Sequence, residues 1–327
     1  MPHPSNHASK PLAPAIRKAL KVMEHRFIHR FSNREIRSAL ETFLTAEPDW
    51  VQNAIARDPA LSNKPGPENM MMMYKGMMAR AFHYEAHALY EQAEVLKETK
   101  PKKAAKLFLQ AHSISESAKS LTQIEIHEGA TIGTDFFIDH GTGVVIGETA
   151  EIGNNVFLYH DVTLGAAAKR TAEVNPFGIA RRHPRVGNNV TLSKGTSVLG
   201  PITLGNGTSI ASSAKLEGMI ETGENVRIGK AALIRSSSEG AITIGNNARI
   251  GSGAQVHGNI TIGDGALIEA GVTVRRNIAA GEHFTAAKAA AEAYSPPKPA
   301  EKSWVARSAP PTASGQRRAL SFGDSRR

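Results

Sequence analysis

Side chains that could transfer a proton stand directly after an aliphatic position in residues 138–143. There, Asp139 and His140 follow Ile138. A histidine, with an ordinary pKa of about 6.5, takes a proton from a hydroxyl near neutral pH if a carboxylate orients its other ring nitrogen. Glu125, which precedes His140 by 15 residues, is a candidate for that carboxylate. The alternatives are structural: Glu125 could be a solvated edge residue, and Asp139 could accept backbone hydrogen bonds at a corner.

A second polar group is the sequence Arg-Arg-His-Pro at residues 181–184. It fits either an anion clamp or a basic corner, since guanidinium groups bind carboxylates and phosphates through paired hydrogen bonds. Asp58 is a further acidic candidate, although an Asp before a Pro could also start a turn or a helix.

Metal and thiol chemistry are not expected. The chain has no cysteine, which excludes disulfides, thiolate metal sites and a cysteine nucleophile. His83 and His87 have the i, i+4 spacing of a helical metal pair, but the sequence offers no evident third ligand. We therefore predict no metal.

The element that must position these side chains is a repeat of one aliphatic residue every six positions, from about residue 123 to residue 274. A period of six fits neither an amphipathic helix nor an alternating strand, but it fits short strands joined by tight corners. Three such strands close a triangular coil, and stacked coils bury a continuous aliphatic column. The repeated positions are Ile126, Ile132, Ile138 and Val144, then Ile146, Ile152, Leu158 and Leu164, then Val186, Leu192, Val198, Leu204, Ile210 and Leu216, and finally Ile244, Ile250, Val256, Ile262, Ile268 and Val274.

The repeat is interrupted at three places. Residues 166–185 break it for longest, so we expect a loop extruded from a coil corner, where functional residues commonly lie. Shorter breaks at residues 218–225 and 236–241 predict corner insertions.

The remaining sequence divides the chain into three parts. Residues 1–121 lack the period and favour helix-forming residues, which predicts an N-terminal helical domain. Residues 122–287 form the predicted β-helix with its loop at 166–185, and residues 288–327 read as a disordered basic tail. The fold class is therefore α+β.

Charge and hydropathy limit the partners. The net charge is +9, and its concentration in the tail favours a solvated segment over a nucleic-acid surface. No apolar run approaches the roughly 20 residues that span a bilayer, and the N-terminus lacks the apolar core of a signal peptide. We expect a cytoplasmic protein without a nucleic-acid or membrane partner.

Several motifs in order resemble the serine O-acetyltransferases of bacteria and plants, over roughly residues 54–213. "DHGTGVVIGETA" at 139–150 is similar to that family's active-site signature, "VTLG" at 162–165 precedes its loop, and "RHP" at 182–184 closes it. "RDPA" at 57–60 and "YKG" at 74–76, with His87, also fit the family.

The resemblance implies a left-handed β-helix and transfer of an acetyl group from acetyl-CoA, the co-substrate, to L-serine, giving O-acetylserine for cysteine biosynthesis. It implies that His140 is the general base and that Glu125 stands where the family has an aspartate. Roles near the substrate are implied for the acids Asp58 and Asp139, the clamp Arg182 and the second histidine His183. Ala166, Lys194 and Ser212 are implied along the CoA groove.

The resemblance also implies a homotrimer with active sites between neighbouring prisms. In the family, two trimers commonly pair into a hexamer through the helical domains. Three departures bear on this. Alanines at 166–168 replace glycines of the loop, Lys194 could either contact a phosphate or obstruct the pantetheine arm, and the prism continues beyond the family's usual end. The chain ends in Arg327 rather than isoleucine, so a complex with the next enzyme of cysteine synthesis is not expected.

Two alternatives stay open. Glu125 and the altered loop also suit an acyltransferase for another hydroxy or amino acceptor. The extra coils and the tail also suit a non-catalytic assembly protein that docks a partner.

Overall fold

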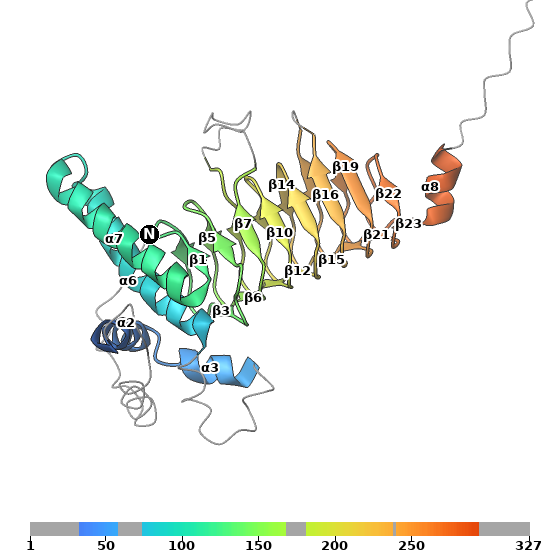
Figure 1. The fold of residues 1–327 in the computed structure, drawn as a ribbon. Helices are drawn as coiled ribbons and strands as arrows, with labels where there is room; N and C mark the ends of the chain where they lie inside the picture. The colour runs from blue at the N-terminus through green and yellow to red at the C-terminus, as the bar shows by residue number, and fades with distance from the viewer. Residues whose placement is uncertain (1–32, 58–73, 168–180, 238–239, 294–327) are drawn as a thin grey trace, which may run out of the picture.

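The computed structural model describes residues 33–57, 74–167, 181–237 and 240–293. The first described elements are helices that lie against one end of a long prism of stacked coils, and a short helix follows the other end of the prism (Figure 1). This arrangement confirms the predicted fold class of N-terminal helices followed by a parallel β-helix.

The helices are α2 (Asn33–Ala46), α3 (Trp50–Arg57), α6 (Lys75–Leu96) and α7 (Pro101–Thr122). The long helices α6 and α7 pack along each other through buried alanines spaced by seven residues. These small side chains let the helix axes approach closely. The alanines are Ala79, Ala86 and Ala93 in α6 and Ala104, Ala111 and Ala118 in α7. Helix α7 begins with Pro101 in its first turn. It ends at Gln123, which has a left-handed backbone conformation (φ 64°).

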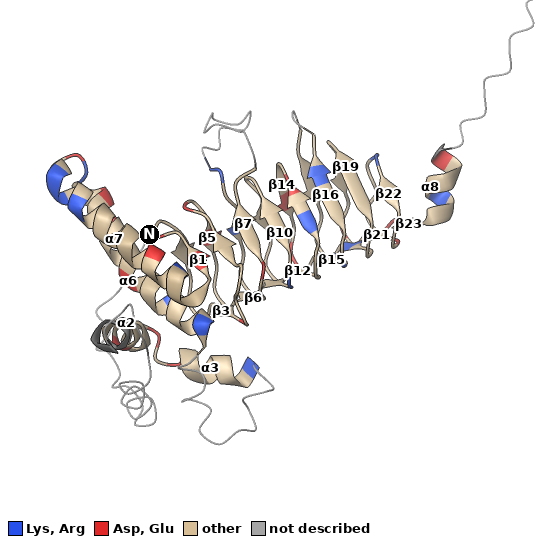
Figure 2. Cartoon of the chain, viewed as in Figure 1, with Lys and Arg blue, Asp and Glu red and all other residues tan. Residues whose placement is uncertain are grey.

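Four exposed lysines lie where α6 ends and α7 begins (Figure 2). Lys97, Lys100, Lys102 and Lys103 are all exposed there. The rise of about 1.5 Å per residue along the 22-residue α6 places this turn about 33 Å from the helix's first residue. These charges therefore lie far from the prism corner that α6 contacts at its N-terminal end.

The prism consists of three parallel sheets, A, B and C, to which each coil contributes one strand. Sheet A contains β1 (Glu125–Ile126), β4 (Val145–Ile146), β7 (Thr163–Gly165), β10 (Ser197–Leu199), β13 (Lys215–Glu217), β16 (Leu233–Ser236), β19 (Gln255–Gly258) and β22 (Thr273–Val274). Sheet B contains β2 (Thr131–Ile132), β5 (Glu151–Ile152), β8 (Arg185–Val186), β11 (Thr203–Leu204), β14 (Ile220–Thr222), β17 (Ile242–Ile244) and β20 (Thr261–Ile262). Sheet C contains β3 (Phe137–Ile138), β6 (Phe157–Leu158), β9 (Thr191–Leu192), β12 (Ser209–Ile210), β15 (Arg227–Ile228), β18 (Arg249–Ile250), β21 (Leu267–Ile268) and β23 (His283–Phe284).

The strand register confirms the period of six. Ser197 pairs with Lys215, which is an 18-residue coil made of three six-residue rungs. The repeated aliphatic residues point inward and form one continuous core along the prism. The longest interruption lies between β7, which ends at Gly165, and β8, which begins at Arg185, and its extrusion as a loop stays a prediction. Its residues 168–180 lie outside the described residues.

One of the two shorter interruptions is confirmed and the other is wrong. Ile220 pairs with Ile242, an offset of 22, so four extra residues enter near 236–241 as predicted. Across 218–225 the offset stays at 18, since Thr203 pairs with Glu221. The repeat continues there through Thr222, a buried polar residue whose Oγ1 accepts a hydrogen bond from Gly205 N at 2.9 Å.

The end of the prism differs from the predicted boundary. Helix α8 (Ala286–Ala293) follows β23, so residues 288–293 are helical rather than part of a disordered tail. Residues 294–327, where the rest of that prediction falls, lie outside the described residues. In the described parts of the chain, every helix is too short or too polar to cross a membrane.

Candidate active site

His140 lies on a corner that is longer than the equivalent corner of the next coil. Six residues (139–144) separate β3 from β4, whereas four separate β6 from β7 in the next coil. We call residues 139–144 the His140 corner. The histidine adopts a left-handed conformation (φ 59°) that non-glycine residues seldom take, and Gly141 and Gly143 also have positive φ. Its side chain is 75% exposed. The corner therefore presents an accessible imidazole.

Helix α6 packs against the strand that precedes this corner. A Cβ atom on Gly76 would lie 2.2 Å from the carbonyl oxygen of Ile138, so only glycine lets the helix backbone approach the last residue before the corner. The Trp50 indole donates to the carbonyl of Phe136 at 2.9 Å. Gly76 of the "YKG" motif therefore lets the helical domain pack against β3, the strand that precedes His140.

His140 has neighbours on its own corner and on the next coil. Its Nε2 lies 3.7 Å from Asp139 Oδ2, and its ring meets that of His160 edge-on with centroids 6.3 Å apart. His160 Nδ1 is 2.8 Å from Asp161 Oδ2. Sequence reasoning missed this second His-Asp pair. The signal was its position at the equivalent corner, 20 residues after His140.

Glu125 is occupied elsewhere in the single chain. Its carboxylate accepts from Lys119 Nζ of α7 at 2.8 Å. Among the described residues, the ion pair that His140 makes is with Asp139 instead. The orienting role of Glu125 stays a prediction, and it requires the carboxylate to leave Lys119.

His183 lies at a different corner and is almost fully buried, with 6% exposure. Its Nδ1 lies 3.1 Å from the backbone nitrogen of Thr149 and 2.8 Å from Thr149 Oγ1. A Cβ on Gly147 would lie 2.2 Å from the ring. Burial first, and then the charge of Arg182, lower the pKa of His183. We call residues 147–150 with His183 the His183 corner.

The two arginines before His183 behave differently. Arg181 is half-buried and donates to Thr203 Oγ1 at 3.0 Å, and desolvation lowers its pKa. Arg182 is exposed and makes no hydrogen bond or ion pair with the described residues. The two guanidinium groups therefore differ in exposure and in their partners among the described residues.

A single chain does not bring the two corners together. The His140 corner precedes β4 and the His183 corner follows it, so they lie at opposite ends of the same strand. At about 3.3 Å per residue, the three steps from Val144 to Gly147 alone span about 10 Å. The two histidines therefore lie at opposite edges of one face of the prism.

The residues predicted for CoA binding lie on both of these prism edges. Lys194 and Ser212 occupy successive coils of the edge that carries His140, where Ser213 N donates to Lys194 O at 2.9 Å. Ala166 follows β7 on the other edge. Asp58 lies outside the described residues.

The described histidines near the helices have structural partners. His83 Nε2 lies 3.0 Å from the carbonyl oxygen of Ala130, and His87 Nδ1 lies 2.7 Å from that of Glu128. In the described residues, no group of three or more His, Asp or Glu side chains is arranged to hold a metal ion.

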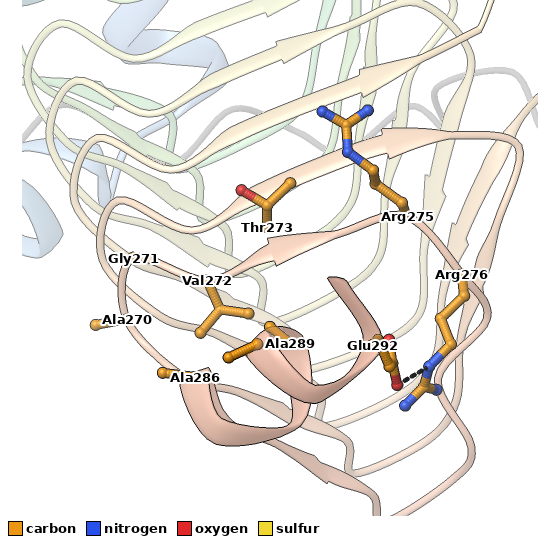
Figure 3. A pocket seen from close by; sticks show the side chains of 10 residues that line it. Ala270, Gly271, Val272, Thr273, Arg275, Arg276, Ala286, Ala289 and Glu292 are labelled. Carbon is orange, nitrogen blue, oxygen red and sulfur yellow. Dashed lines mark hydrogen bonds and ion pairs between the residues drawn. The ribbon is translucent and has the colours of Figure 1, made fainter. Parts of the chain in front are cut away.

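A cavity of about 630 Å³ lies at the opposite end of the prism, between the last coil and α8 (Figure 3). Arg276 on its wall is neutralised by Glu282 (2.9 Å) and Glu292 (2.7 Å). This cavity is separated from the His140 corner by most of the coils, so it is not the candidate site.

Known proteins share both the repeat and the sequence. Residues 241–276 match the family described as bacterial transferase hexapeptide (six repeats). A serine acetyltransferase of Helicobacter pylori is 36% identical over 184 residues, which are 56% of this chain and 94% of the relative. One from Bacillus licheniformis is 43% identical over 141 residues, 43% of this chain and 56% of the relative. The crystal structure of serine acetyltransferase from Brucella abortus has a TM-score of 0.47 at 27% identity, covering 65% of this chain and 78% of that chain.

The stacked six-residue rungs and the named relatives together identify a hexapeptide-repeat acyltransferase. Because nearly the whole Helicobacter relative aligns at 36% identity, the chain belongs to the serine acetyltransferase family.

Proposed function

We propose that this protein transfers the acetyl group of acetyl-CoA to the hydroxyl of L-serine, with His140 as the general base. The observation that carries the proposal is the accessible imidazole of His140 on an extended corner that the helical domain holds in place. The product, O-acetylserine, feeds cysteine biosynthesis.

The reaction needs one proton carrier and no acyl-enzyme. His140 takes the proton of the serine hydroxyl, and the hydroxyl oxygen attacks the carbonyl carbon of the thioester. A carbon–oxygen bond forms and the carbon–sulfur bond breaks. The CoA sulfur leaves as a thiolate and receives the proton from the His140 imidazolium, which returns the base to its starting state.

The substrate's charged groups are bound by groups of opposite charge. We assign Asp139 and Asp58 to the amino group. Arg182 binds the carboxylate, since its guanidinium has no partner among the described residues. Lys194, Ser212 and Ala166 line the path of CoA. Glu125 orients His140 once it releases Lys119.

The site is shared between chains of a homotrimer. The support is topological, because the two corners stand at opposite ends of β4 and a neighbouring prism would supply the missing edge. Pairing of two trimers through the helical domains is compatible with this arrangement.

The test is release of CoA thiol from acetyl-CoA with serine, homoserine, threonine and simple amines as acceptors. We expect serine to give the highest kcat/KM. Release with a different acceptor only would identify another acyltransferase, and no release with any of them would favour the non-catalytic assembly protein.

A matched pair of variants makes the test specific to the proposed base. His140→Asn removes the base but keeps a residue that tolerates the left-handed backbone. His257→Asn changes a histidine of β19 on the same prism, several coils away. Serine-dependent release should vanish in the first variant and persist in the second.

A further inference from the structure

The Nδ1 atom of His183 receives two hydrogen bonds from one residue. Thr149 N lies 3.1 Å from it and Thr149 Oγ1 lies 2.8 Å from it. A backbone N–H can only donate, so Nδ1 must carry a lone pair rather than a proton. The Thr149 hydroxyl then donates to the same lone pair. The hydrogen-bond network therefore assigns the proton of the neutral ring to Nε2.

Protonation of the whole ring is opposed at the same place. A proton on Nδ1 of this buried ring would point at the Thr149 N–H. Burial and the Arg182 charge act in the same direction and lower the pKa of His183. The ring is thus held neutral near physiological pH.

The rest of the Gly-Glu-Thr segment fixes the position of the ring. Gly147 leaves the space that the imidazole occupies, since a Cβ there would overlap Cδ2 and Nε2. Glu148 anchors the corner to α6, because its Oε1 accepts from Tyr90 OH at 3.3 Å. Among the described residues, none accepts a hydrogen bond from His183 Nε2. The one free polar atom of the ring is a donor.

We propose that Thr149 is a positioning residue that fixes His183 as a neutral Nε2–H donor, and that this donor binds the serine carboxylate beside Arg182. His183 then cannot remove the hydroxyl proton, because neither ring nitrogen has a free lone pair. The assignment of the bound group rests on the proposed function, whereas the assignment of the tautomer does not.

The tautomer is tested directly by magic-angle-spinning NMR of the full chain labelled with ¹⁵N at its histidines. His183→Asn identifies the signals of His183 by their loss. We expect an unprotonated Nδ1 and a protonated Nε2 from pH 6 to 8. A protonated Nδ1, or an average of both tautomers, would overturn the inference even if the enzyme acetylates serine.

Kinetics of two variants test the role of the hydroxyl. Thr149→Val removes it with little change in shape, and Thr149→Ser keeps it. Loss of one such hydrogen bond should raise KM for serine about tenfold in Thr149→Val, with kcat changed less than about twofold. Thr149→Ser should match the natural chain.

A purely structural role for Thr149 would lower kcat and raise KM for both substrates together, or would lower the melting temperature without the KM change. Either result contradicts the proposal. If the protein fails to acetylate serine at all, the proposed function fails while the NMR result still decides the tautomer.

Discussion

The two corners at the ends of β4 hold their histidines in opposite ways. The side chain of His140 is 75% exposed and touches neighbours only loosely, with Asp139 at 3.7 Å. His183 is 6% exposed and its Nδ1 is saturated by Thr149. The first ring is accessible from solvent, and the second is held by its hydrogen bonds to Thr149. This difference is the basis on which we propose a base at the first corner and a hydrogen-bond donor at the second.

The comparison also explains why the corners are built differently. The His140 corner gains two residues over the next coil and uses left-handed backbone to turn the imidazole outward. The His183 corner keeps a short turn and uses Gly147 to admit a ring that arrives from the far end of the extruded loop. One corner exposes a side chain, and the other encloses one.

The largest effect is expected when the exposed corner loses its base. His140→Asn should lower kcat by about 10²–10⁴-fold, which is the usual contribution of a general base. The pH dependence of kcat should lose the limb that reports this base. Stopped assays of CoA thiol release between pH 6 and 9 measure both. A variant that keeps more than a tenth of the natural kcat would assign the base to another group.

A smaller but still large effect is expected at the enclosed corner. Gly147→Ala places a methyl group where the His183 ring lies, and a ring displaced by about 1 Å can cost about 10²-fold in kcat/KM. Gly165→Ala is the control, because its Cβ would meet only flexible side-chain ends of Leu199 and Thr163 at 3.0 Å or more. Equal kinetic constants for the two variants would show that the position of His183 is unimportant.

Lys194 lies on the prism edge that carries the His140 corner. Its replacement should change KM modestly and for one substrate only. Lys194→Ala should raise KM for acetyl-CoA about fivefold, as expected for an exposed charge near a phosphate. KM for serine should not change. Lys215→Ala, another exposed lysine on the prism, is the control. A fall in KM for acetyl-CoA would mean that Lys194 obstructs the groove instead.

The smallest effect concerns stability and pH. Burial lowers the pKa of His83 and of His183, so below about pH 6.5 the unfolded chain binds protons that the folded chain does not. The free energy of unfolding should therefore decrease as the pH falls, by at most about 1.4 kcal/mol per pH unit for each histidine.

Urea unfolding of the natural chain and of His83→Gln from pH 5.5 to 7.5 measures this. The amide of the variant can still donate to Ala130 O but does not titrate, so its stability should depend less on pH. Identical slopes would contradict the assignment to His83.

The fold follows from the sequence because each rung places one aliphatic side chain in the core. The same rule explains the error at residues 218–225. Thr222 occupies an inward position but is polar, and its hydroxyl is satisfied by Gly205 N, which no search for aliphatic residues detects. Where four residues truly enter, near 236–241, the period itself shifts and the sequence reveals it.

The site was only partly predictable. His140, Asp139, Arg182 and His183 stand in recognisable motifs, but their separation onto two corners depends on which strand each one flanks. Thr149 and Gly147 lie inside the motif at residues 139–150. Their role depends on the ring of His183, which packs against them only in the folded chain. The contact of Glu125 with Lys119 joins two elements whose relative placement depends on tertiary packing.

The most direct test of the shared site is activity complementation. His140→Asn and Arg182→Ala chains are unfolded together in equal amounts, refolded and assayed for serine-dependent thiol release, beside each variant refolded alone. If neighbouring chains supply the two corners, random trimers should regain about a quarter of the natural activity, because one site in four receives both intact residues. Activity no higher than that of either variant alone would place the whole site within one chain and contradict the account.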